Sequence, residues 1–212
     1  MIGPLAPINA HAHMYQIAYR ESLQNGDIIF RTGTDVLARL VLTHGRESRF
    51  SHVGIIIRRE DNWAVFHSTP AEPNVIGGVH AELLDDFVSI NVAAEVGFFR
   101  VEGLNEHMRQ SIREYLLSQL GKPFDYRFQY SDDSAQYCTE LVLKALRNAG
   151  IDLEPSMQRV QVFTLPEAAI PPDSLLLSPS LRELTPKSKS VCPVPPDIQT
   201  NVLTYPAPDR PC

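Results

Sequence analysis

The feature that most constrains this chain is a cysteine at the start of a predicted amphipathic helix. Cys138 follows a turn-rich acidic segment, residues 130–134, and apolar side chains recur behind it at helical spacing. The N–H groups and aligned dipoles at a helix N-terminus favour a thiolate, so a catalytic Cys138 is expected to alkylate well below pH 8.5. The alternative interpretation is a small buried cysteine that packs as an apolar residue.

Two histidines lie in a predicted β-hairpin upstream of this cysteine. Residues 51–57 and 63–68 have strand composition and are separated by a turn at residues 60–62. His52 lies near the start of the first strand and His67 near the end of the second, so an antiparallel pairing makes them neighbours, with side chains about 5 Å apart. A cysteine nucleophile needs a base, and the base needs a polar group that orients it. His52 could be the base and His67 the orienting group, although each alone could be an ordinary strand residue.

Further polar and aromatic residues surround this candidate site in the sequence. Four aromatic residues between positions 124 and 130 could wall a pocket or simply pack together. We predict Tyr126, Asp125 and Tyr137 as oxyanion or substrate-pocket residues. Glu140 is expected to be a structural acid at the helix start, and no partner is evident for His80.

No metal or cofactor is predicted. His11 and His13 form an H-x-H pair, but no third ligand stands near them, and no phosphate-cradling glycine loop is present. Cys138, Cys192 and Cys212 are too few and too scattered for a disulfide framework or a zinc site.

The composition limits the partners and the location. The net charge of −6 and the lack of a Lys/Arg-rich run argue against nucleic acid as a partner. No segment reaches the roughly 18 apolar residues of a membrane span, and residues 1–24 lack a signal-peptide pattern. A cytoplasmic location is expected as written, or a secreted or periplasmic one if a signal was removed or a dedicated export system is used. The oligomeric state is left open.

We predict three segments along the chain. Residues 1–25 contain an N-terminal helix over 9–24, and residues 26–183 form the main domain. The Pro-, Ser- and Thr-rich segment 184–212 is predicted to be an extended or disordered tail. The main domain is expected to contain helices at 34–43 and 104–120, strands at 26–31 and 95–102, and a short strand or helical turn within 79–87.

Three motifs occur in a familiar order: Gly-Asp-Ile-Ile-Phe at 26–30, Ser-His-Val-Gly-Ile at 51–55 and Tyr-Cys-Thr-Glu-Leu-Val at 137–142. With Phe-Asp-Tyr at 124–126, they resemble the circularly permuted branch of the NlpC-type papain-like cysteine hydrolases, the YiiX/YebB-like proteins. The resemblance implies an α+β fold, in which a small antiparallel sheet or half-barrel packs on the helix that carries the cysteine. It also implies Cys138 as nucleophile, His52 as general base and His67 as third polar residue, where YiiX-like members often have a glutamate.

The resemblance implies a bacterial cysteine hydrolase, of thiol-protease type, that cleaves an amide bond in a peptide or isopeptide-like substrate. One alternative is a lipid acyltransferase or deacylase that resembles lecithin retinol acyltransferase, because the aromatic segment 124–130 is compatible with an acyl chain. Another is a non-catalytic module that binds a peptide or a lipid. The scaffold alone does not settle the substrate.

Overall fold

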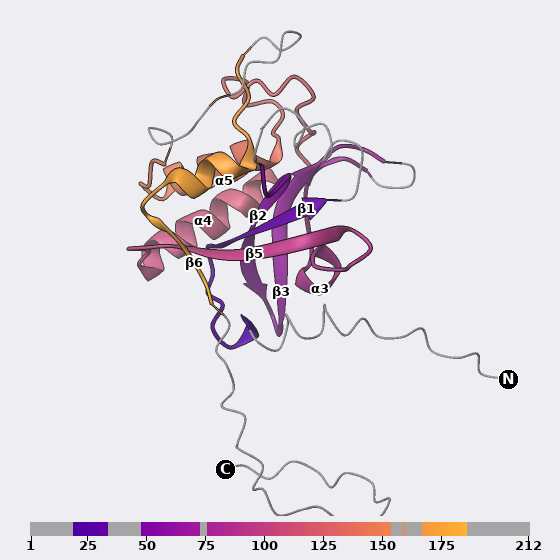
Figure 1. The fold of residues 1–212 in the computed structure, drawn as a ribbon. Coiled ribbons are helices and arrows are strands. Elements are labelled where there is room, and N and C mark those ends of the chain that lie inside the picture. The colour runs from indigo at the N-terminus through magenta and orange to yellow at the C-terminus, as the bar shows by residue number, and fades with distance from the viewer. Residues whose placement is uncertain (1–18, 34–47, 73–75, 154–158, 160–166, 186–212) are drawn as a thin grey trace, which may run out of the picture.

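A computed structural model describes residues 19–33, 48–72, 76–153, 159 and 167–185 (Figure 1). Its strands and helices are largely segregated along the chain, in the α+β manner predicted from the sequence. They are β1 (Asp27–Gly33), β2 (His52–Arg59), β3 (Asn62–Thr69), β4 (Gly78–Leu83), α3 (Leu84–Phe87), β5 (Ala93–Val101), α4 (Glu106–Gln119), α5 (Cys138–Asn148), the 3-10 helix η2 (Pro172–Leu177) and β6 (Leu181–Glu183).

The strands form one antiparallel sheet in the order β4-β3-β2-β1-β5-β6. The predicted hairpin is β2–β3, in register from Ile55 opposite Phe66 to Arg59 opposite Asn62. Its turn uses Glu60 with a φ of 53°, a left-handed conformation that closes the tight connection. This sheet places β4 at one edge, next to β3 alone.

The two faces of the sheet pack against different elements. The larger core lies on the face covered by α4 and α5, which lie side by side in Figure 1, and it includes Val53, Ile55, Phe66 and Cys138. The smaller core lies on the face toward α3 and includes Ile29, Ile56, Val65 and Phe87. Because side chains alternate along a strand, neighbouring residues of β2 belong to opposite cores.

Helix α5 begins at Cys138, as predicted. Leu141, Val142 and Leu146 are fully buried against the sheet. Its first turn is fixed by Glu140, whose side chain accepts a hydrogen bond from the backbone N–H of Tyr137 at 3.2 Å. The cysteine therefore has one defined position, at the point where a helix meets the sheet.

The remaining local predictions have mixed outcomes. The helix predicted over 104–120 is α4, and the segment 79–87 contains both β4 and α3. The helix predicted over 34–43, most of the helix over 9–24, His11, His13 and nearly all of the 184–212 tail lie outside the described residues. Within the described part of the chain, no helix has the length and apolarity to cross a membrane.

Candidate active site

The two histidines of the hairpin are in direct contact. Nε2 of His52 lies 2.8 Å from Nδ1 of His67, and the ring centroids are 5.1 Å apart. Extending the register of β2 and β3 puts His67 opposite Gly54, so the two histidines are diagonal neighbours on one face. The predicted pairing is thus present, with the rings leaning toward each other across the strand pair.

Gly54 makes room for this contact. A Cβ at this position would lie 2.5 Å from Cγ1 of Val65, 2.9 Å from the carbonyl oxygen of Phe66 and 3.2 Å from Cβ of His67. Only a residue without a side chain fits here. The glycine of the Ser-His-Val-Gly motif therefore serves the histidine pair directly.

The histidine pair is neutral at physiological pH, with His67 fully buried and His52 partly buried. Burial lowers the pKa of His67 to about 4, although the nearby Glu82 carboxylate opposes that shift. Burial also holds the pKa of His52 well below its usual range, and the positive charge of Arg31 adds to the effect. A neutral His52 is in the protonation state that a general base requires.

Glu82 supplies a carboxylate that sequence reasoning missed. Oε2 of Glu82 lies 3.4 Å from Nε2 of His67, on the opposite side of the ring from His52. Burial opposes ionisation of Glu82, but His67, Arg31 and His80 outweigh burial and lower its pKa. His67 therefore stands between the candidate base and an ionised carboxylate, in place of the carboxylate that YiiX-like members often have at this position.

Cys138 is buried at the start of α5, with 9% of its surface exposed. Burial raises the pKa of its thiol, while the Thr139 hydroxyl and the backbone N–H groups of Val53, Thr139 and Cys138 itself favour the thiolate. Burial wins, so the thiol is neutral in this state. This outcome is opposite to the expectation from helix position alone, because the surrounding apolar core, and not the helix dipole, dominates.

The structure brings the Cys138 thiol to the start of β2 but does not bond it to His52. The thiol accepts from the backbone N–H of Val53, the residue that follows His52. Cys138 belongs to the core under α5, whereas the His52 ring packs toward Phe87 on the α3 face. Among the described residues, no hydrogen bond links the Cys138 thiol to the His52 ring. In hydrolases without substrate this contact is often long and tightens on binding.

The three predicted pocket residues have other partners in this structure. Tyr126 is exposed, and its hydroxyl accepts a hydrogen bond from the Ala71 backbone N–H at 2.8 Å. The Asp125 carboxylate accepts from the Arg127 and Gln129 backbone N–H groups and so shapes a turn. Their role toward a substrate stays a prediction.

Tyr137 is also engaged in the fold. Its side chain is almost completely buried, and its hydroxyl accepts a hydrogen bond from the Ile170 backbone N–H at 3.4 Å. Burial raises the pKa of this phenol, so it stays protonated. Its backbone N–H, bonded to Glu140, positions the residue that precedes the cysteine.

Residues 22–185 match the model of a family described as permuted papain-like amidase enzyme, YaeF/YiiX, C92 family. The chain belongs to this family. The uncharacterized protein YiiX of Escherichia coli (strain K12) is 31% identical over 129 residues, which cover 59% of this chain and 58% of YiiX. The chain thus aligns with less than two thirds of the length of that relative. The family predicted from the three motifs is confirmed.

The fold of this member of the permuted papain-like family also matches a solved structure. The crystal structure of the metalloprotein yiiX from Escherichia coli O157:H7 aligns with a TM-score of 0.65 at 23% sequence identity. The alignment covers 77% of this chain and 97% of that one. It confirms the predicted fold class, an antiparallel sheet packed on the helix that carries the cysteine.

The spacing of His80 and Glu82 is a sequence signal for the position of Glu82. His80 and Glu82 are two residues apart on a strand, so they point to the same face. What could not be read from spacing was the pairing of His80 directly opposite His67. That register brings His80, for which no partner was evident from the sequence, beside the candidate triad.

Proposed function

We propose that this chain is a cysteine-dependent amidase in which Cys138 is the nucleophile, His52 the general base and His67 the residue that orients the base. The observation that carries the proposal is the 2.8 Å contact between His52 and His67 at the start of β2, where the next residue, Val53, bonds the Cys138 thiol through its backbone. Membership of an amidase family supports amide bonds as the substrate class.

The geometry assigns a role to each ring nitrogen of His52. Since Nε2 faces His67, Nδ1 is the nitrogen left to receive the thiol proton. As the Cys138 sulfur attacks the amide carbonyl carbon, His52 takes this proton and becomes an imidazolium. His52 then gives the proton to the departing amine nitrogen, the C–N bond breaks, and a thioester remains on the cysteine.

Hydrolysis of the thioester completes the cycle. Water attacks the thioester carbonyl while His52 again serves as base, and the carboxylic acid leaves as Cys138 recovers its proton. The imidazolium is stabilised by His67, which accepts from Nε2–H of His52 and directs its own Nε2–H toward Glu82. The oxyanion would be met at the N-terminus of α5 by the Cys138 backbone N–H, with Tyr126 as the candidate second donor.

The test is acyl-enzyme formation with p-nitrophenyl acetate, followed by turnover of a panel of peptide amides that includes a γ-D-glutamyl–diaminopimelic peptide. Wild type should release nitrophenol in a burst and carry an acetyl group on the peptide containing Cys138. Cys138→Ala should lose burst and turnover while keeping its circular dichroism spectrum and melting temperature. The matched control is Cys192→Ala, which should behave as wild type.

Three outcomes would contradict the proposal. Retained amide turnover in Cys138→Ala would remove the cysteine from the mechanism. Specific binding of a peptide or lipid without any acetyl transfer to Cys138 would favour the non-catalytic module instead. Acyl transfer from a lipid ester with no amide turnover would favour the acyltransferase.

A further inference from the structure

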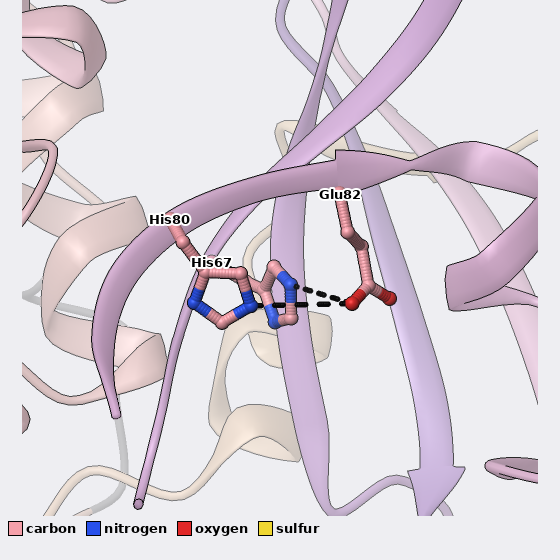
Figure 2. Close-up of side chains that lie close together, drawn as sticks. All are labelled: His67, His80 and Glu82. Carbon is pink, nitrogen blue, oxygen red and sulfur yellow. Dashed lines mark ion pairs between the residues drawn. The ribbon is translucent and has the colours of Figure 1, made fainter. Parts of the chain in front are cut away.

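Three side chains on β3 and β4 converge on one point (Figure 2). One nitrogen each of His67 and His80 and one oxygen of Glu82 lie within 4.8 Å of one another. Oε2 of Glu82 is 3.4 Å from Nε2 of His67 and 3.9 Å from Nε2 of His80. Two ligands on a tetrahedral zinc ion are roughly 3.3 Å apart, so small rotations would bring all three atoms to bonding distance.

Nε2 of His67 lacks a hydrogen bond of its own. It is a buried atom without a hydrogen-bond partner, and its nearest acceptor, Glu82, is beyond good hydrogen-bonding distance. The His67 side chain is fully buried, yet this nitrogen points into the cluster (Figure 2). A buried polar atom without a well-formed hydrogen bond, directed at two other ligand groups, is placed as a metal ligand would be.

Each of the three groups also has a neighbour on the side away from the cluster, as metal ligands in proteins usually do. Nδ1 of His80 lies 3.0 Å from the Gly78 carbonyl, which fixes this ring with Nε2 as the free acceptor. Nδ1 of His67 lies against His52, and Oε1 of Glu82 lies 3.4 Å from Nη1 of Arg31. The remaining atom of each side chain therefore faces the same point.

Solvent can reach the cluster. Of the charges near it, one favours and one opposes binding of a divalent cation. The His80 and Glu82 side chains are 32% and 26% exposed, so an ion can enter past them and keep a water ligand. Glu82 contributes the negative charge of the cluster, while the Arg31 guanidinium beside it opposes binding. A site of two imidazoles and one carboxylate with an open position is typical of zinc and of other divalent transition metals.

We propose that His67, His80 and Glu82 form a binding site for a divalent transition-metal ion, and that the bound ion switches the amidase off through His67. The metal site stands on the contacts above, whereas the switch rests on the proposed function. His67 is the shared member, since one of its nitrogens faces the cluster and the other faces the candidate base.

The switch follows from the tautomers of two linked imidazoles. Without metal, His52 donates its Nε2–H to Nδ1 of His67, which leaves Nδ1 of His52 free to accept the thiol proton. A metal on Nε2 of His67 displaces the proton there, so that neutral His67 carries its proton on Nδ1 and donates toward His52. His52 must then accept at Nε2 and hold its proton on Nδ1. Both rings stay neutral, but the base can no longer accept from Cys138.

The binding test uses Co²⁺ as a spectroscopic probe of the full chain. Wild type should bind one ion with visible d–d bands and without the intense near-ultraviolet band that a thiolate ligand produces. Cys138→Ala should bind with unchanged affinity. His80→Ala and Glu82→Gln should each weaken binding by more than the roughly 10–100-fold cost of losing an outer hydrogen-bond partner. The matched control is His107→Ala, an exposed histidine on α4 that should leave binding unchanged.

The switch is tested by the ratio of acetylation rates with and without Zn²⁺ within each variant. Zinc should slow wild type and His107→Ala at least tenfold and should leave the rate of His80→Ala nearly unchanged. Binding that survives in His80→Ala but fails in Cys138→Ala would overturn the site, because the ion would then sit on the cysteine. Zinc that binds the cluster yet leaves the rate unchanged, or raises it, would overturn the switch. Absence of acetylation in every sample would count against the proposed function, while the cobalt spectra would still decide the site.

Discussion

The cysteine and the histidines of this site are held in place in different ways. Cys138 is positioned by its own helix, through the Glu140 contact and the buried face of α5. His52 and His67 are positioned by the register between β2 and β3, and β4 pairs with β3 on the other side of His67. The comparison teaches that the nucleophile depends on local structure, whereas the base depends on strand register.

The largest effect is expected from removing the base. His52→Ala should lower the rate of acyl transfer by about 10²–10⁴-fold, the usual contribution of general base catalysis. His67→Ala should cost less, because His67 orients the base and does not take the proton from the thiol. The check is kcat/KM for p-nitrophenyl acetate in both variants, with thermal melts to confirm folding. Equal losses in the two variants would place His67 in the proton transfer itself.

The second prediction concerns a substitution that disturbs the histidine pair, which depends on strand register, and leaves Cys138 unchanged. Gly54→Ala introduces a Cβ that would overlap Val65 and the Phe66 carbonyl, so β3 must shift and the histidine contact must lengthen. We expect a loss of roughly 1–3 kcal/mol in stability and a fall in activity, because overpacking strains a tight core. Urea unfolding and burst kinetics measure the two effects. The double variant Gly54→Ala/Val65→Ala should recover only part of the stability, since the backbone contact with Phe66 remains.

The third prediction concerns Cys138, which depends on local structure. It separates the effect of helix position on the thiol pKa from the effect of burial. Because burial raises the pKa of Cys138, its labelling by iodoacetamide without substrate should rise at a higher pH than labelling of Cys192 and Cys212. At pH 8 it should be the slowest of the three. Mass spectrometry of each cysteine peptide across a pH series checks this. Fast labelling of Cys138 below pH 7, abolished in His52→Ala, would mean instead that the thiolate–imidazolium pair forms without substrate.

The smallest effect is expected at the helix start. Burial raises the pKa of Glu140 to about 7, against 4.5 for a free side chain, although Lys144 opposes the shift. A group with a raised folded-state pKa stabilises the fold below its unfolded pKa, and this contribution is lost as the pH rises through the folded value. Wild type should therefore lose stability relative to Glu140→Gln between about pH 5 and pH 8. A difference that is constant with pH would show that Glu140 is ionised throughout.

The same contrast explains what the sequence could predict. Periodicity and turn residues were sufficient for α5, for the β2–β3 hairpin and for the meeting of His52 and His67, because these depend on short segments. The partners of His80 and the role of Glu82 depend on how β4 pairs with β3 across a loop, which spacing along the chain does not determine. The pKa of Cys138 depends on the whole core around it, and burial in that core acts against the effect of the helix position.

Strand β4 lies at the edge of the sheet, with a paired strand on one side only. A change of its register would leave the other strand pairs intact, although Val79 would lose its backbone hydrogen bonds with Gly121 and Lys122. A shift by one residue would turn His80 and Glu82 to the opposite face. The contact between His52 and His67, one strand further in, would be untouched. Through this one edge strand, descendants of the same scaffold could gain or lose the metal-binding cluster while retaining the hydrolytic residues.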